Sequence, residues 1–209
     1  MAVDQETADE AAASRLDEEA VLIRFTEGNR DAFEWLVRQY REPAVRFAYH
    51  LTGDYHTAED LAQDCFAYLL VYPEKYDYRA SFKTYLFTIL RNKSIDSVRK
   101  RARQQSLPYT AESSSVHNPD EGNPEQLAII REEDVEWRRR LHQMKPDYGQ
   151  AVYLVDVGQM SYEQAAAVMG RNQMSFKVLL HRARKKLRQI YEKEEWDCEV
   201  NGTGAVISG

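Results

Sequence analysis

Apolar residues recur at helical spacing along most of this chain, and turn-forming residues separate the periodic segments. The first segment, residues 18–27, predicts a short helix that ends at Gly28. Asp31 is expected to cap a long second helix, with a kink at Pro43 and an end at Gly53. The chain therefore opens with two predicted helices joined by a tight turn.

The same period continues through the next stretch. Thr57 is expected to cap a third helix, because its hydroxyl can accept a hydrogen bond from a free backbone N–H group, and Pro73 should stop it. Residues 73–81 read as a loop. Ser81 should then cap a fourth helix that continues to about residue 105, where the apolar face gives way to basic residues.

Helical periodicity is lost over residues 104–124, where Ser, Pro, Asn, Gly and acidic residues dominate. So long a structureless connection is unusual inside one compact domain. We therefore predict an all-α protein of two small helical domains joined by a flexible acidic linker, the second domain containing a helix-turn-helix. The expected divisions are a disordered acidic N-terminus (1–17), a first domain (18–105), the linker (106–133), a second domain (134–193) and a disordered tail (194–209).

Four helices are expected in the second half, at about 124–143, 146–158, 161–169 and 172–193. Ser161 and Gln164 form a capping box at the start of the third, and Gly170 suits the left-handed turn that ends it.

Two short helices around such a glycine are typical of a helix-turn-helix. Ala165, Ala166 and Ala167 would allow a close crossing, and Phe176 with Leu179 or Leu180 would anchor the second helix. The side chains left to face DNA are Arg171, Asn172, Gln173, Ser175, Lys177, His181, Arg182 and Arg184.

Charge is distributed unevenly. The net charge is −6, yet residues 171–188 hold seven basic residues and no acidic one, and residues 79–105 hold eight basic residues against Asp96. The acidic residues concentrate in residues 1–20 and 106–136. Because local potential decides whether phosphate is attracted, both basic stretches are candidate nucleic-acid surfaces. A basic helical hairpin that simply faces solvent is the alternative.

The predicted loop and the start of the fourth helix interleave aromatic residues with cations: Tyr76, Tyr78, Phe82 and Tyr85 with Lys75, Arg79 and Lys83. Aromatic faces can stack on unpaired bases while cations hold the backbone. Phe82 and Tyr85 in the same stretch read better as core residues.

Several functional classes find no support. Cys65 and Cys198 have no metal-like spacing, and no Ser-His-Asp, Cys-His or paired metal-ligand pattern occurs, so we expect no enzyme activity, no metal, no cofactor and no small-molecule substrate. No stretch has the roughly 20 apolar residues of a membrane span. No secretory signal is found, so we expect no membrane insertion and a cytoplasmic location.

The segments "LTGDYHTAEDLAQDCFAYLL", "SFKTYLFTILRNKSIDSVRKR", "SYEQAAAVMG" and "HRARKKLR" occur here in this order. The chain thereby resembles the extracytoplasmic-function (ECF) group of RNA polymerase sigma factors, over roughly residues 20–105 and 134–190. Val178 and Leu179 depart from this pattern, because they stand where the family often has Ser and Arg.

The resemblance implies a transcription initiation factor that binds core RNA polymerase and promoter DNA, opens the duplex, and is often held by an anti-sigma factor. It implies contacts to the −35 element from the helix-turn-helix donors above together with Lys185. Contacts to the −10 element would come from Tyr76, Tyr78, Arg79, Lys83, Arg91, Asn92, Arg99, Lys100 and Arg101. Docking on the polymerase would use Glu59, Asp60, Gln63 and Asp64. A stand-alone helix-turn-helix regulator is the alternative function.

Overall fold

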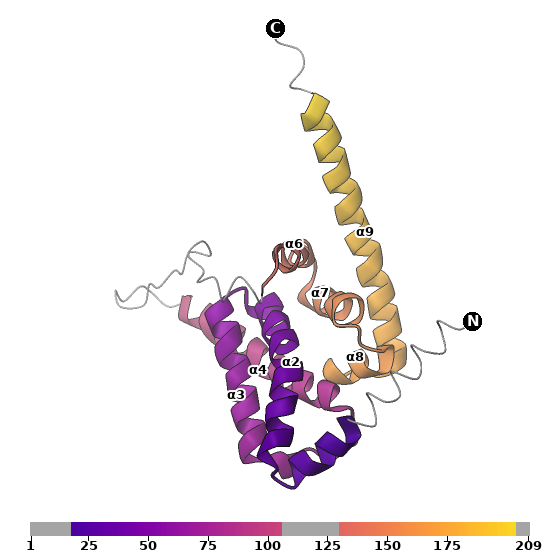
Figure 1. The fold of residues 1–209 in the computed structure, drawn as a ribbon. Coiled ribbons are helices and arrows are strands. Elements are labelled where there is room, and N and C mark those ends of the chain that lie inside the picture. Colours follow the sequence, from indigo (N-terminus) through magenta and orange to yellow (C-terminus); the bar gives the residue numbers. More distant parts are fainter. Residues whose placement is uncertain (1–17, 106–129, 204–209) are drawn as a thin grey trace, which may run out of the picture. The chain divides into compact units, whose positions relative to one another are not determined.

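A computed structural model describes residues 18–105 and 130–203, and these residues form helices and turns without a strand. The chain divides into two compact units, Met1–Tyr109 and Thr110–Gly209 (Figure 1). The all-α prediction is confirmed. The predicted disorder of residues 1–17 and 204–209, and most of the predicted linker, lie outside the described residues.

The N-terminal unit consists of a helical segment at residues 18–26, α2 (Arg30–Thr52), α3 (Tyr55–Val71), the short 3₁₀ helix η1 (Pro73–Lys75) and α4 (Phe82–Gln105). Helix α2 packs against both α3 and α4 (Figure 1). The core is aromatic and aliphatic, with fully buried Phe25, Phe47, Phe82, Phe87 and Leu36. Removal of these large apolar side chains from water stabilises the three-helix packing.

Two predicted N-caps in this unit are wrong. Asn29, not Asp31, caps α2, because its Oδ1 accepts from the N–H of Ala32 at 2.9 Å. Asp54, not Thr57, caps α3, because its carboxylate accepts from both the N–H of Thr57 (2.8 Å) and the Thr57 hydroxyl (2.6 Å). Each helix therefore begins before the predicted cap.

Other boundaries agree with the sequence. Gly53 ends α2 at φ 74°. The Ser81 hydroxyl accepts from the N–H of Thr84 at 3.3 Å and caps α4. Helix α2 runs through Pro43 without interruption, and the kink expected there stays a prediction.

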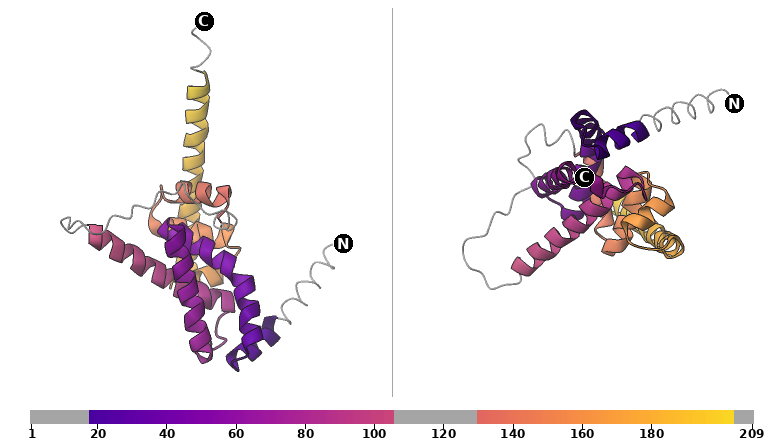
Figure 2. Two further views of the ribbon diagram at one scale, coloured as in Figure 1. Left: turned by 60° about the vertical axis from the view of Figure 1, so that its left-hand side comes forward. Right: turned by 90° about the horizontal axis from the view of Figure 1, so that it is seen from below.

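The C-terminal unit consists of α6 (Glu132–Leu141), α7 (Pro146–Val152), the π-helical turn η2 (Tyr153–Val157), α8 (Tyr162–Val168) and α9 (Gln173–Thr203). Helix α6 begins at Glu132, and residues 124–129 of the predicted helix lie outside the described residues. Helix α9 is longer than predicted, since it continues through residues 194–203, where disorder was expected (Figure 2).

An ion-pair cluster explains part of this extension. Glu194 of α9 accepts from Arg139 at 2.7 Å and from Arg140 at 2.9 Å, both on α6. The Arg140 guanidinium also lies over the ring of Tyr191, 4.7 Å from its centroid. These contacts fix α9 against α6 as far as Glu194, one residue past the predicted end of the helix. No helix within the described residues is long and apolar enough to cross a membrane.

Candidate nucleic-acid and protein interfaces

Helices α8 and α9 form the predicted helix-turn-helix. The Ser161 hydroxyl accepts from the N–H of Gln164 at 3.1 Å, and the Gln164 side chain accepts from the N–H of Ser161 at 3.0 Å. Gly170 makes the turn at φ 62°, a conformation that costs other residues more than glycine. The capping box and the turn are therefore confirmed.

The packing of this motif is more selective than the sequence indicated. Ala165 and Ala166 are buried, whereas Ala167 is exposed and does not contribute to the crossing. Phe176 and Leu180 anchor α9 in the core, and Leu179 is half-buried. The opposite side of α9 is consequently left facing outward.

Two of the predicted DNA-contacting side chains, Asn172 and Ser175, form capping hydrogen bonds at the start of α9. The Asn172 Oδ1 accepts from the N–H of Ser175 at 2.7 Å, and the Ser175 hydroxyl donates to the Asn172 carbonyl oxygen at 3.0 Å. Gln173, Lys177 and His181 are exposed. The capping bonds fix the first turn of α9 and leave those three side chains to face outward.

The predicted cations of this motif fall into two groups. Arg171 is paired with Asp147 of α7 at 2.5 Å. Arg184 donates to both carboxylate oxygens of Asp156, and to the Tyr162 hydroxyl at 3.3 Å. Hydrogen bonding to Asp156 raises the pKa of the Arg184 guanidinium. Both arginines are thus held by the unit itself.

Arg182 and Lys185 differ from that pair. Both are exposed, and neither forms an ion pair with the part of the chain that the structure describes. Their charges are available to a phosphate backbone.

The loop before α4 is built around Tyr76. Only 5% of this residue is exposed, its hydroxyl donates to the Ala80 carbonyl oxygen at 3.0 Å, and its ring packs on Phe82 and Tyr85. Burial raises the pKa of Tyr76 to about 12. Tyr76 is thereby a core residue of the loop, and its burial argues against the expected base stacking.

Tyr78 and Arg79 are exposed, as are Glu74, Lys75 and Asp77 of the same loop. Tyr78 has φ 60°, and its hydroxyl donates to the Leu22 carbonyl oxygen at 3.1 Å and lies 2.5 Å from the Thr26 hydroxyl. Arg79 is paired with Asp77 at 3.2 Å. The Tyr78 ring is consequently held at the surface by the first helix of the unit.

Helix α4 separates the predicted −10 residues onto different sides. Each residue turns a helix by about 100°, so positions seven apart share a side and positions nine apart are opposed. Tyr85, Asn92 and Arg99 therefore form one stripe. Lys83 and Arg101, eighteen residues apart, lie on the opposite side from Asn92.

The surroundings of these side chains agree with their division between two sides of α4. Lys83 is half-buried beside the Phe87 ring, and burial lowers its pKa. The charge of Arg101 helps to lower the pKa of Asp54, at the start of α3. Arg91 is half-buried, whereas Asn92, Arg99 and Lys100 are exposed. Tyr85, assigned to the core from the sequence, is only half-buried. Its seven-residue spacing from Asn92 could have shown from the sequence that the two side chains share one side of α4.

A groove of about 270 Å³ lies between α2 and α3. Glu59 and Gln63 line it, and Glu59 pairs with Arg41 at 2.6 Å. Asp60 and Asp64 are exposed on the next side of α3. The apolar lining was missed from the sequence; it consists of Phe33, Val37, Val45, Ala62, Phe66, Ala67 and Leu70.

The described residues offer neither a cluster of metal ligands nor a reactive thiol. Within 18–105 and 130–203, no three His, Cys, Asp or Glu side chains are grouped as metal ligands would be. Cys65 is fully buried, and burial raises the pKa of its thiol to about 12.

Comparison with known proteins gives consistent matches. Residues 36–104 match the family model Sigma-70 region 2, and residues 134–187 match Sigma-70, region 4. The chain is 31% identical over 165 residues to ECF RNA polymerase sigma factor SigE of Mycolicibacterium smegmatis, covering 78% of this chain and 62% of SigE. It is 32% identical over 149 residues to ECF RNA polymerase sigma factor EcfG of Rhodopseudomonas palustris, covering 71% and 79% respectively.

A solved structure resembles the fold. The sigma factor RpoE in complex with the anti-sigma factor NepR, from Bartonella quintana, aligns with a TM-score of 0.58 and 29% identity, over 77% of this chain and 96% of that one. The sequence resemblance is therefore confirmed by independent matches to both halves of the chain.

Proposed function

The chain belongs to the ECF sigma factors of the sigma-70 family, and from this premise we propose that it binds core RNA polymerase, directs it to specific promoters and promotes strand opening in the cytoplasm. The protein has no catalytic activity of its own in this proposal. One observation carries it. A single chain holds a helix-turn-helix with a basic outer face and, in a separate unit, an aromatic loop leading into a basic helix.

The C-terminal unit reads the −35 element in the major groove. Residues near the start of a recognition helix reach base edges, and residues further along meet phosphates. Gln173 and Lys177 therefore read bases, and His181, Arg182 and Lys185 hold the backbone. Asn172 and Ser175 position the helix through their capping bonds, and Arg171 and Arg184 do so through their acidic partners.

The N-terminal unit holds the opened −10 strand. A base that leaves the duplex loses stacking, and an aromatic face offsets that loss. Tyr78 supplies an exposed ring, and Tyr85 lies on the same α4 stripe as Asn92 and Arg99. Asn92 can donate and accept hydrogen bonds toward a base, whereas Arg99 and Lys100 suit phosphate contacts.

Docking on the polymerase uses α2 and α3. Glu59 and Gln63 line the apolar groove there, and Asp60 and Asp64 are exposed beside it. Apolar area buried at the centre with polar groups around it is the usual anatomy of a specific protein interface. An anti-sigma factor is a further proposed partner, as the similar RpoE binds NepR.

The test is binding of tagged full-length protein to core RNA polymerase, compared among variants. Asp60→Lys and Leu70→Ser should each weaken binding, while Glu27→Lys, a charge reversal at an exposed turn outside the groove, should not. Wild-type protein that shifts DNA but does not bind polymerase would instead support the stand-alone regulator.

Strand opening needs a separate measurement. Asn92→Ala should reduce opening, followed by permanganate reactivity of promoter thymines, while polymerase binding is unchanged. Gln104→Ala, a change to another exposed amide side chain of α4, is the matched control. Normal opening with Asn92→Ala would remove Asn92 from the proposal.

A further inference from the structure

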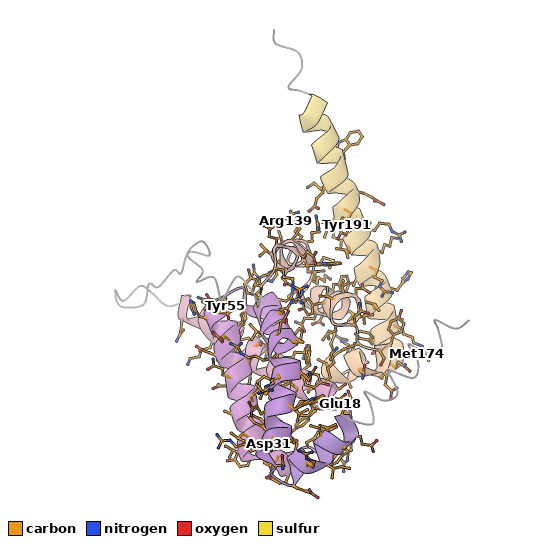
Figure 3. All side chains as sticks on the ribbon, viewed as in Figure 1. Glu18, Asp31, Tyr55, Arg139, Met174 and Tyr191 are labelled. Atoms are coloured by element: carbon orange, nitrogen blue, oxygen red, sulfur yellow. The ribbon has the colours of Figure 1, made fainter. Side chains whose placement is uncertain are left out.

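Two apolar side chains stand exposed at the start of α9. Met174 is 78% exposed and Val178 is 49% exposed, although the same helix buries Phe176 and Leu180. Figure 3 labels Met174 at the start of α9. They are four residues apart, so they lie on the same side of the helix, one turn apart. Neighbouring apolar side chains that are exposed to solvent can mark a contact surface, and the residues around them indicate what kind of partner it binds.

Their position on α9 is defined by the core. Phe176, Leu180 and Ala183 are buried and mark the inner side of the helix. At about 100° per residue, the side opposite to them carries Met174, Val178, His181 and Lys185 in that order. The outermost stripe of α9 is therefore apolar in its first two turns and polar or basic afterwards.

The setting of the pair is cationic. Lys177 and Arg182 are exposed on either side of this stripe, and the sequence from 171 to 191 contains no acidic residue. A protein partner or a second copy of this chain would have to cover those charges with acidic groups, whereas DNA supplies phosphates on both sides of its groove. The surroundings thus favour DNA as the occupant.

The major groove presents one apolar group to such side chains. Base edges there display hydrogen-bond donors and acceptors, and only thymine adds a C5-methyl group. We infer that Met174 and Val178 contact thymine methyl groups in the −35 element, so that this factor selects T·A base pairs at the positions that these two side chains reach. The inference rests on the proposed function of the helix-turn-helix.

Helix geometry sets the spacing of these contacts. Four residues rise about 6 Å along a helix, and base pairs are about 3.4 Å apart. The two side chains therefore reach thymines within about two base-pair steps, on either strand.

Replacement of thymine by uracil tests this, because it removes the methyl group and keeps every hydrogen-bonding atom. The full-length protein with core polymerase first selects a promoter from a library with a randomised −35 region. Each thymine of the selected element is then replaced singly. We expect about a fourfold loss of binding at one or two thymines, the value for one buried methyl, and little at the others.

The variant Met174→Ser/Val178→Ser should bind the thymine and uracil promoters equally. Val135→Ser is the matched control, because Val135 is also 49% exposed and lies in the same unit; it should retain the discrimination. All variants change exposed side chains, and thermal unfolding checks that each is folded.

Three results would overturn the inference. Uracil could be tolerated everywhere while −35 selection persists, which leaves the proposed function standing. The double variant could keep the thymine preference and lose binding to polymerase, which makes the pair a protein contact. No −35 preference at all in the wild type would remove the proposed function as well.

Discussion

Arg182 and Arg184 lie two residues apart on α9, yet truncation of each to alanine should have different consequences. Arg184 is held by both oxygens of Asp156 and by the Tyr162 hydroxyl, whereas Arg182 is exposed without an ion pair among the described residues. Arg184→Ala should therefore lower the stability of the C-terminal unit. Arg182→Ala should lower DNA binding with little change in stability.

The magnitudes follow from these environments. A bidentate arginine–carboxylate pair is stronger than a single ion pair, but the Arg184 and Asp156 side chains are 43% and 27% exposed, so solvent screens them. We expect a loss of about 1 kcal/mol, which lowers Tm by roughly 4–8 °C in a unit of this size. Loss of one phosphate contact by Arg182→Ala should reduce the slope of log K against log salt concentration by about 0.9.

Two assays separate these effects: thermal unfolding of the full-length protein, and fluorescence anisotropy of a labelled −35 duplex titrated at several KCl concentrations. Asp156→Asn should reproduce most of the Tm loss of Arg184→Ala, and the double variant should lose less than the sum, because the two residues form one interaction. A reduced salt slope with an unchanged Tm for Arg184→Ala would refute the assignment and make Arg184 a phosphate contact.

Three further predictions concern the folded units. Cys65 should resist iodoacetamide at pH 8 in a variant whose other cysteine is serine, because its buried thiol has a pKa raised to about 12, and should react fully in urea; rapid labelling of the native protein would contradict this. Gly158→Ala should destabilise the C-terminal unit by about 1–3 kcal/mol in urea unfolding, since its Cβ would lie 2.8 Å from the Leu154 carbonyl oxygen. Burial alone raises the pKa of Asp54, but hydrogen bonds from Thr57 lower it overall, so Asp54→Ala should cost about 1 kcal/mol at pH 7, measured by urea unfolding. That cost should fade as the pH drops from the carboxyl's unfolded pKa through its lower folded pKa, and an equal cost at pH 2 would be inconsistent with an ionised cap.

Local features of this fold could be predicted because neighbouring residues determine them. The capping box of Ser161, the turn at Gly170 and the end of α2 at Gly53 each depend on residues within one turn. The two wrong caps show the limit of such reasoning. Asn29 and Asp31, or Asp54 and Thr57, are all good capping residues, and the path of the entering chain decides which side chain accepts.

Features that depend on distant residues could not be read from the chain. The pairing of Arg184 with Asp156 spans 28 residues, and the extension of α9 is supported by arginines of α6 more than 50 residues away. For Tyr85, the sequence shows the seven-residue spacing that puts it on the same side of α4 as Asn92. Its exposed fraction depends on how α4 packs and could not be predicted.

The backbone at Tyr78 has a consequence for timing. A non-glycine residue at φ 60° is unfavourable by roughly 1 kcal/mol, and the bonds of its hydroxyl to Leu22 and Thr26 keep it there in the free protein. Ordering a free backbone costs about 1–2 kcal/mol of entropy per residue, and this loop has lost that freedom before any base arrives. In the proposed role, capture then needs no loop closure. The rate of strand opening would then be limited by how often a base leaves its stack in the DNA, and not by a movement of the loop.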